Sequence, residues 1–422
     1  MNHDRQADAR RGFALILVVT LLALLVLAIY ALSVLVRVQT QVTTATGDRQ
    51  QARQHALIAL RMGLGELQRL AGPDARVTAM AGVSGIPEGG AQTTRHWCGV
   101  WSGEGVFLGW LASGAQSSSA AVLPGLATVA LVGEGSVGKS VTDSEHVIAG
   151  VIPITVAETA GTPGNAATIG AYAYLVLDEG VKVSVRTPGE VLGAGGLRPV
   201  LAGEMTSSAQ GRLRTAVEIY DARLVDASCY AQLAQLPLPS KALTPSTLQD
   251  NFHHVTLTAL VVRDGALSSG VVNLNTSSVH VWRSILATYN AVPGVERWSE
   301  ADMITEGRAI ARGLANSASG KIAHAPFTSA AAFGASELLA DHLPSPITPE
   351  EFMAAIAPAL AVRSDTFRIR GYGEARNPQR DGEVEATAWC EAVVQRLPPV
   401  APEGNERRFA ITYFRWLGPE DG

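Results

Sequence analysis

One uninterrupted apolar segment near the N-terminus constrains this chain more than any other feature. Residues 13–36 read FALILVVTLLALLVLAIYALSVLV and contain no charged residue. Roughly 20 apolar residues are enough to cross a bilayer, and a single segment can satisfy its own backbone there only as a helix. Arg10 and Arg11 come just before the segment, and basic residues on a short flank favour its retention in the cytoplasm. We expect a single-pass inner-membrane anchor with the remaining chain in the periplasm or at the cell surface.

The junction between Gly12 and Phe13 separates three interpretations of this segment. A cleaved secretory signal has a shorter apolar core followed by an A-x-A-like site, and no such site follows here. A plain anchor explains the hydrophobicity but not the RRGF junction. A prepilin leader ends in Gly, and cleavage comes before a Phe that begins the apolar helix. We favour the third interpretation, with residues 1–12 as leader, and the plain anchor stays open.

The helical pattern continues beyond the apolar segment. Residues 37–72 are more polar but keep a helical period in their small and apolar residues. The predicted buried stripe consists of Ala52, Ala56, Ala59, Leu60, Gly63, Leu67 and Leu70. Gly72 and Pro73 predict the end of the helix, and Gly63 and Gly65 predict weakened last turns. A helix of this extent is about 90 Å long and resembles the spine of type IV pilins and type II secretion pseudopilins.

The fifth residue after the predicted cleavage site departs from the pilin pattern. Most pilins have Glu at this position, where its carboxylate is thought to pair with the N-terminal amine of a neighbouring subunit, and this chain has Leu17. Subunits without this Glu resemble general secretion pathway protein K and related minor pilins, which lie at or near the fibre tip. The resemblance implies a capping or initiating position.

Composition excludes several classes of function. Hydrophobic residues make up 47% of the 422 residues, which is enough for a large core. The 33 basic and 38 acidic residues give a net charge of -5 without a long Lys/Arg run, so nucleic acid is not an expected partner. Cys98, Cys229 and Cys390 lie far apart and form no CxxC motif, so a zinc site is not expected. Either all three are buried thiols, or two of them form a disulfide and the third remains unpaired.

A P-loop pattern occurs in the first half of the chain. Gly133, Gly138, Lys139 and Ser140 match GxxxxGK[ST] after an apolar stretch, the motif that cradles phosphates at the start of a helix. Residues 141–153 read VTDSEHVIAGVIP, which is β-branched and interrupted by Gly and Pro and therefore predicts no helix. We interpret the motif as a Gly-rich turn between strands. A nucleotide-binding protein is the less favoured alternative.

Other candidate sites have structural interpretations that we prefer. Residues 174–178 resemble a Walker B strand but run into residues 181–185 as an antiparallel hairpin, with Asp178 and Glu179 in a solvated turn. Adjacent His253 and His254 are expected at a strand edge or in a loop. The sequence has no HExxH motif, and no histidine lies at metal-ligand spacing from an acidic residue, so we predict no metal site. We also expect the tryptophans of the first half to be core residues, namely Trp97, Trp101 and Trp110. These patterns predict no catalytic residue, no cofactor and no enzyme.

The second half of the chain predicts a helical unit followed by strands. Helix starts are indicated by Ser277 or Ser278, by Ser299 with Asp302, and by Thr348 with Pro349 and Glu351. Residues 326–329 are expected to precede a short helix through Phe333 and Leu338. Three later segments alternate as strands around residues 367–369, 384–394 and 409–413, with a turn at 377–382. We expect them to form an antiparallel sheet against the long helix. The predicted divisions are 1–12, 13–36, 37–72, 73–270 as a β-rich head, 271–362 as a helical insert, and 363–422.

This order of parts resembles general secretion pathway protein K, in which a motif similar to VNLNT opens a helical insert. The blocks TRHW, YAYLVLDEGVK, VNLNTSSVHVWR and RRFAITYFRWL are similar to the Verru_Chthon cassette protein A family of Verrucomicrobia. The resemblance implies an α+β fold and a non-enzymatic pilin-like subunit. Its partners would be other pilins, contacted through the first helix, prepilin peptidase and the membrane. A calcium site is not carried over, because the matching ligands are missing. The alternative is an anchored binding protein that never assembles.

Overall fold

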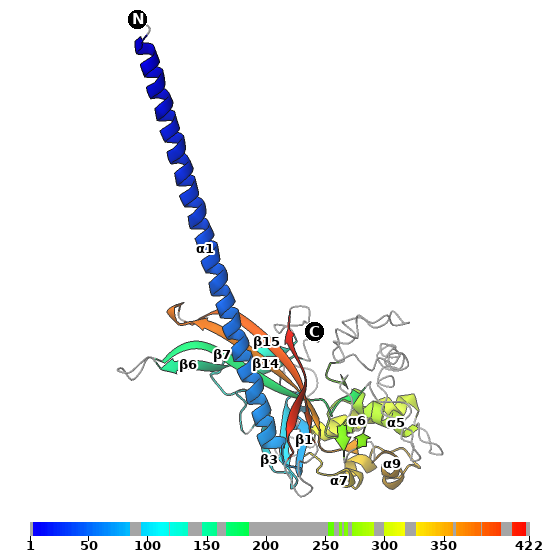
Figure 1. Ribbon diagram of the computed structural model, residues 1–422. Helices are drawn as coiled ribbons and strands as arrows, with labels where there is room; N and C mark the ends of the chain where they lie inside the picture. The colour runs from blue at the N-terminus through cyan, green and yellow to red at the C-terminus, as the bar shows by residue number, and fades with distance from the viewer. Residues whose placement is uncertain are drawn as a thin grey trace.

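The computed structural model describes one long helix and an α+β head. The described residues are 3–84, 94–117, 119–133, 146–157, 166–184, 252–256, 261–263, 266–268, 272–290, 299–316, 326–357, 360–380, 382–397 and 407–418. Helix α1 (His3–Ala71) has 69 residues and projects from the head as a single rod (Figure 1). At 1.5 Å per residue it is roughly 100 Å long. The predicted weakening at Gly63 and Gly65 does not interrupt it.

Five antiparallel strands form the main sheet, in the order β16 (Phe409–Leu417), β15 (Glu383–Arg396), β14 (Thr366–Asn377), β7 (Ala166–Asp178) and β6 (Ile152–Ala157). The three predicted C-terminal strands are confirmed, and β14 turns into β15 through a 3-10 turn (Pro378–Arg380) and Gly382 at φ 75°. Strand β7, from the first half of the chain, pairs along β14 from Phe367 opposite Asp178 to Ala375 opposite Gly170.

The second half of α1 packs on one face of this sheet, and its predicted stripe is buried. Close approach depends on two glycines of β14. A Cβ atom at Gly373 would lie 2.2 Å from the backbone nitrogen of Ala56, and one at Gly371 would lie 2.7 Å from the Ala56 carbonyl oxygen. Only glycine allows helix and strand backbones this near to each other. The sequence of β14 therefore fixes where the helix lies.

A second layer of short strands packs beside the main sheet. Strands β1 (Arg76–Met80), β2 (Cys98–Ser102) and β3 (Phe107–Trp110) form an antiparallel sheet, and a 3-10 turn (Ala81–Ser84) follows β1. Strands β4 (Thr128–Val132) and β5 (Val147–Gly150) form an antiparallel pair. The three tryptophans predicted in the core are buried there, which confirms that prediction, with Trp101 and Trp110 in edge-to-face contact.

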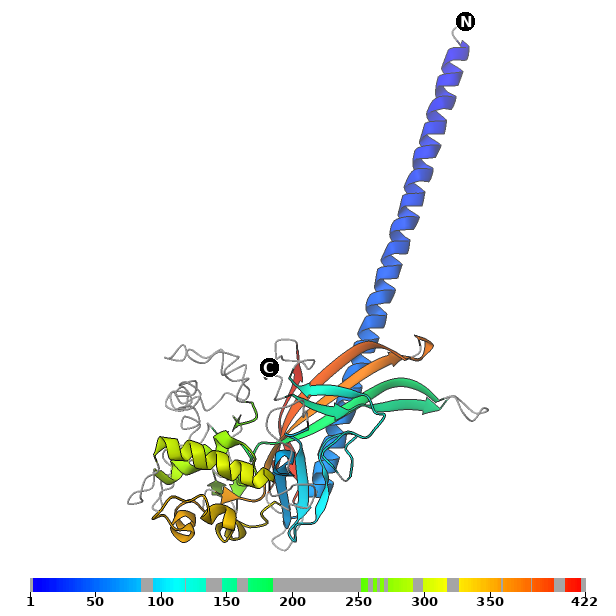
Figure 2. The same cartoon turned by 180° about the vertical axis from the view of Figure 1, so that it is seen from behind.

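A helical unit lies beside the end of the sheet that is far from the N-terminus (Figure 2). It contains α5 (Val279–Asn290), α6 (Glu300–Asn316), α7 (Ala330–Gly334), α8 (Glu337–Ala340) and α9 (Pro349–Ile356). The predicted caps are confirmed, including the reciprocal capping box of Thr348 and Glu351. Strands β12 (Val272–Asn273) and β13 (Leu360–Ala361) pair in parallel, so the unit begins and ends at one place.

Further short pairs precede the helical unit. Strand β8 (Val183–Ser184) pairs in parallel with β9 (Val255–Thr256), and β10 (Val261–Arg263) pairs antiparallel with β11 (Ala266–Ser268).

Two predictions about the segment after β7 are wrong. Strand β8 does not fold back on β7 as a hairpin. Near its end β7 pairs with β14 on one edge and with the segment around Ala112 on the other, and β8 pairs with β9. Asp178 and Glu179 are not solvated either, since they are only 3% and 2% exposed. The local alternation of residues correctly predicted that β8 is a strand, but it could not identify the strand with which β8 pairs.

Candidate functional site

The first half of α1 is an exposed apolar surface. Leu17 is 53% exposed, and the large apolar residues after it remain exposed as far as Val42. Such a patch on a folded protein marks a membrane or protein interface, and α1 contains a stretch long and apolar enough to cross a bilayer. Gly12 and Phe13 lie within α1, ahead of this surface. The helix fits a single-pass anchor.

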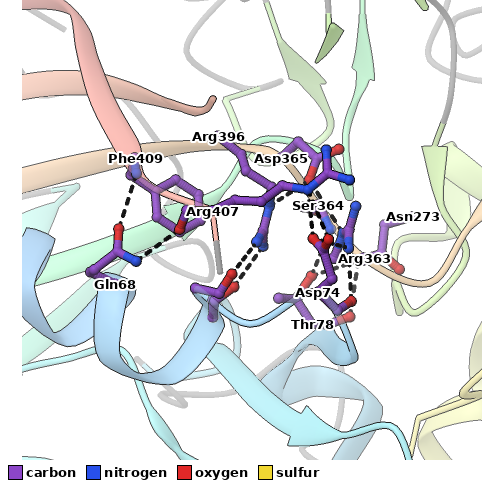
Figure 3. Close-up of polar contacts among 12 residues, drawn as sticks. Gln68, Asp74, Thr78, Asn273, Arg363, Ser364, Asp365, Arg396, Arg407 and Phe409 are labelled. Atoms are coloured by element: carbon purple, nitrogen blue, oxygen red, sulfur yellow. Dashed lines mark hydrogen bonds and ion pairs between the residues drawn. The ribbon is translucent and has the colours of Figure 1, made fainter. Parts of the chain in front are cut away.

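The end of α1 is held by a group of polar side chains that we call the helix-foot clamp: Gln68, Asp74, Arg363, Asp365, Arg396 and Arg407 (Figure 3). Arg396 of β15 donates to the carbonyl oxygens of Ala71 at 2.7 Å and Gly72 at 2.9 Å. A cation at a helix C-terminus offsets the partial negative charge of its unpaired carbonyls. Burial lowers the pKa of Arg396 to about 10, against the raising effect of Asp365.

Two further members of the clamp tie β16 to the helix. The Gln68 amide donates to the Arg407 carbonyl at 2.8 Å and accepts from the Phe409 backbone N–H at 3.0 Å. Asp74 accepts from Arg363 Nη1 at 3.1 Å and from Arg407 Nε at 2.9 Å. Strand β16 and the β13–β14 connection are thus fixed to the same helix end.

The VNLNT segment joins the helical unit to the head. Asn273 Nδ2 lies 2.9 Å from both the carbonyl and hydroxyl oxygens of Thr78, and 3.1 Å from Ser364 Oγ. Asn275 pairs with the backbone N–H and carbonyl of Phe327 at 2.9 and 3.1 Å. Both asparagines are fully buried, so these bonds satisfy polar groups that would otherwise destabilise the fold.

Behind the sheet face opposite α1 lies a buried ion network. Glu179 accepts from Lys182 at 2.7 Å and from Arg368 at 3.0 Å, and Arg368 also reaches Glu391 at 2.6 Å. Arg370 binds Glu391 at 2.9 Å. Burial alone raises the pKa of Glu179, but the charges of Arg368 and Lys182 prevail and lower it to about 2. The residue pattern did not reveal this network, because its members are far apart in the sequence.

The remaining predicted sites are placed as follows. Gly133 ends β4 at φ 94°, and Gly138, Lys139 and Ser140 lie outside the described residues, between the antiparallel strands β4 and β5. His253 and His254 are buried, and the ring of His253 stacks on His96 at 3.6 Å. Cys98 and Cys390 are buried free thiols, and Cys229 lies outside the described residues. Within the described ranges, no group of three His, Cys, Asp or Glu residues could hold a metal ion.

Comparison with known proteins finds a likeness among solved structures. No family model and no curated protein matches the chain. A chain of the GspK-GspI-GspJ complex of the type 2 secretion system from enterotoxigenic Escherichia coli is similar, with 13% identity and a TM-score of 0.37. The match covers 63% of this chain and 82% of that one. The architecture itself defines an α+β protein with a long N-terminal helix and antiparallel sheets.

Proposed function

We propose that this chain is a non-enzymatic minor pseudopilin-like subunit that assembles through α1. One observation carries the proposal: in the same continuous helix, the large apolar side chains are exposed from Leu17 to Val42, and a stripe that begins at Ala52 is buried against the head. The exposed part can lie in a bilayer and, after assembly, in a bundle of similar helices. The buried part fixes the helix rigidly to the head. The fibre would be of the type IV pilus or type II secretion kind.

The proposal includes processing and position. Prepilin peptidase would cleave after Gly12 on the cytoplasmic side of the inner membrane, and the new Phe13 amine would be methylated. Leu17 offers no carboxylate to a neighbour's amine, which supports a place at or near the fibre tip. The sequence blocks quoted above support membership of the Verru_Chthon cassette protein A family.

Processing is tested by N-terminal sequencing and intact mass of the protein from its native membrane. We expect a chain that begins at Phe13 and carries one added methyl group. A Gly12→Val variant serves as the matched control and should keep its leader. A wild-type chain that keeps Met1 contradicts processing and leaves the anchored binding protein that never assembles.

Assembly is tested separately by disulfide crosslinking. A cysteine at Leu24, which is 67% exposed on α1, should give ladders of several subunits in native membranes. A cysteine at Val384, exposed on β15, is the matched control and should not. Equal crosslinking from both positions, or none from Leu24, contradicts assembly through the helix.

A further inference from the structure

A groove of about 510 Å³ opens beside the helix-foot clamp. Strand β1 and helix α7, which contribute to its lining, lie at the end of the head far from the N-terminus (Figure 1). Five parts of the chain meet there: the start of β1, the β2–β3 turn, the start of α7, β13 with the β13–β14 connection, and Arg407 before β16. Its lining includes Arg76, Arg363 and Arg407 together with Asp74. The groove lies away from the apolar surface of α1, so nothing in the proposed assembly uses it.

Among the described residues, the guanidinium groups of the groove have only some of their nitrogens paired. Arg407 binds Asp74 through Nε alone, and Arg363 uses Nη1 for Asp74 and Nε for Asp365 (Figure 3). Arg76 forms no side-chain hydrogen bond or ion pair within the described part of the chain, and its Nε is buried without a partner. Because Arg76 lines the groove, a ligand acceptor there can pair with the remaining nitrogens of its guanidinium group.

Positive charge prevails among the described residues of the groove. Asp74 is the acid in the lining, and the solvated Glu104 is close enough to feel the charge of Arg76. Asp365 is matched by Arg396 at 2.7 Å. In the part of the chain that the structure describes, three guanidinium groups therefore face two carboxylates. Guanidinium groups bind carboxylates and phosphates through paired, charge-assisted hydrogen bonds, so the groove suits an anionic group of this kind.

We propose that this groove binds an acidic peptide segment of a partner protein, with one carboxylate held between Arg76 and Arg407. The volume lies within the range of small-ligand pockets and suits a few residues. Val77 and Leu360 also line it and would pack against the aliphatic part of the peptide. Asp74 would repel a sulfated glycan, whose charge density is higher, more than a peptide that carries carboxylates, so the acidic peptide is favoured. This proposal is independent of fibre assembly.

The test is fluorescence polarisation with the full chain in detergent micelles and a labelled tetra-glutamate peptide. We expect saturable binding that weakens with salt, and no binding of tetra-glutamine. Arg76→Gln should weaken binding about tenfold, because one charge-assisted contact is lost, and Arg76→Lys should recover part of it. The matched control is Arg380→Gln, an exposed arginine far along β14–β15, which should bind as wild type.

A second variant distinguishes a lost contact from misfolding of Arg76→Gln. Ala75→Glu adds a carboxylate at an exposed position of the lining and should also weaken binding while leaving the thermal unfolding midpoint unchanged. Equal binding of the two peptides, or wild-type affinity in both Arg76→Gln and Ala75→Glu, overturns the proposal. Binding of heparin without binding of tetra-glutamate would overturn it in favour of a glycan.

Discussion

Arg396 and Ala71 are joined by a 2.7 Å hydrogen bond from guanidinium to carbonyl oxygen, which connects the end of β15 to the last residue of α1. Asp365 holds the same guanidinium at 2.7 Å. Because the first half of α1 is free of the head, any displacement of the rod acts on this connection. The clamp therefore couples the proposed assembly helix to the main sheet.

Replacing Arg396 by Met should destabilise the head by about 3 kcal/mol, because Asp365 is left buried and short of a partner and the helix end loses its cap. Arg363 stays within 3.3 Å of Asp365, which limits the loss. Urea unfolding followed by tryptophan fluorescence measures the change. Arg380→Met, at an exposed ion pair, should change stability by less than about 1 kcal/mol. Equal effects of the two variants would show that the clamp contributes nothing.

Gly373→Ala should separate α1 from β14 and destabilise the fold by about 2 kcal/mol or more, because its Cβ would meet the backbones of Ala52 and Ala56 at 2.4 and 2.2 Å. Gly65→Ala is the opposite case on α1 itself, with nothing within 4 Å of the added atom. It should stabilise the helix by about 0.5–1 kcal/mol. Thermal unfolding compares the two variants, and the same sign of shift in both would contradict the packing.

Asp178 predicts a pH dependence of stability. Burial raises its pKa to about 6, against hydrogen bonds from Ser364, Thr78 and Gly180. The folded protein therefore binds this proton more tightly than the unfolded chain, whose Asp titrates near 4. It follows that stability from this group rises as the pH falls through about 6. We expect a gain of about 1 kcal/mol between pH 7 and pH 5, which Asp178→Asn lacks.

Two neighbouring titratable groups, His96 and Glu179, also contribute to the pH dependence of stability. The pKa of His96 is lowered by burial and by the charges of Arg95 and Lys182, so its contribution falls as the pH drops below about 6.5. Glu179 loses its contribution only as the pH falls from about 4.5 toward about 2. Both are present in wild type and Asp178→Asn, so the difference between the two unfolding curves isolates Asp178. Parallel curves would refute the prediction.

Asn273→Ala should loosen the helical unit without unfolding the sheet. Its amide is the donor for Thr78 and Ser364, and losing it leaves buried acceptors unpaired at about 1–3 kcal/mol. Hydrogen exchange in α5 should quicken about tenfold, while exchange in β14 and β15 serves as the internal control. Faster exchange in both regions alike would mean that the unit and the sheet open together.

Local patterns in the sequence predicted the elements that are stabilised by residues near each other in the chain. The apolar period placed the helix and its buried stripe, and Ser299 and Thr348 marked helix starts because a cap bonds only within its own first turn. The turn near Gly382 was equally readable, because a positive φ selects glycine. These assignments required no knowledge of distant residues.

The sequence alone therefore determined an exposed helix continuous with a buried one, the helix caps and the C-terminal strands. Tertiary structure decided the partners of β7, the burial of Glu179 and the helix-foot clamp. Glu179 meets Arg368 across 189 positions and Arg396 meets Ala71 across 325. An alternating strand such as β14 is typical of a sheet with one solvated face, and only a second layer packed on that face removes its charged residues from water. Pairing and desolvation depend on which segments meet in space, and no local period contains that information.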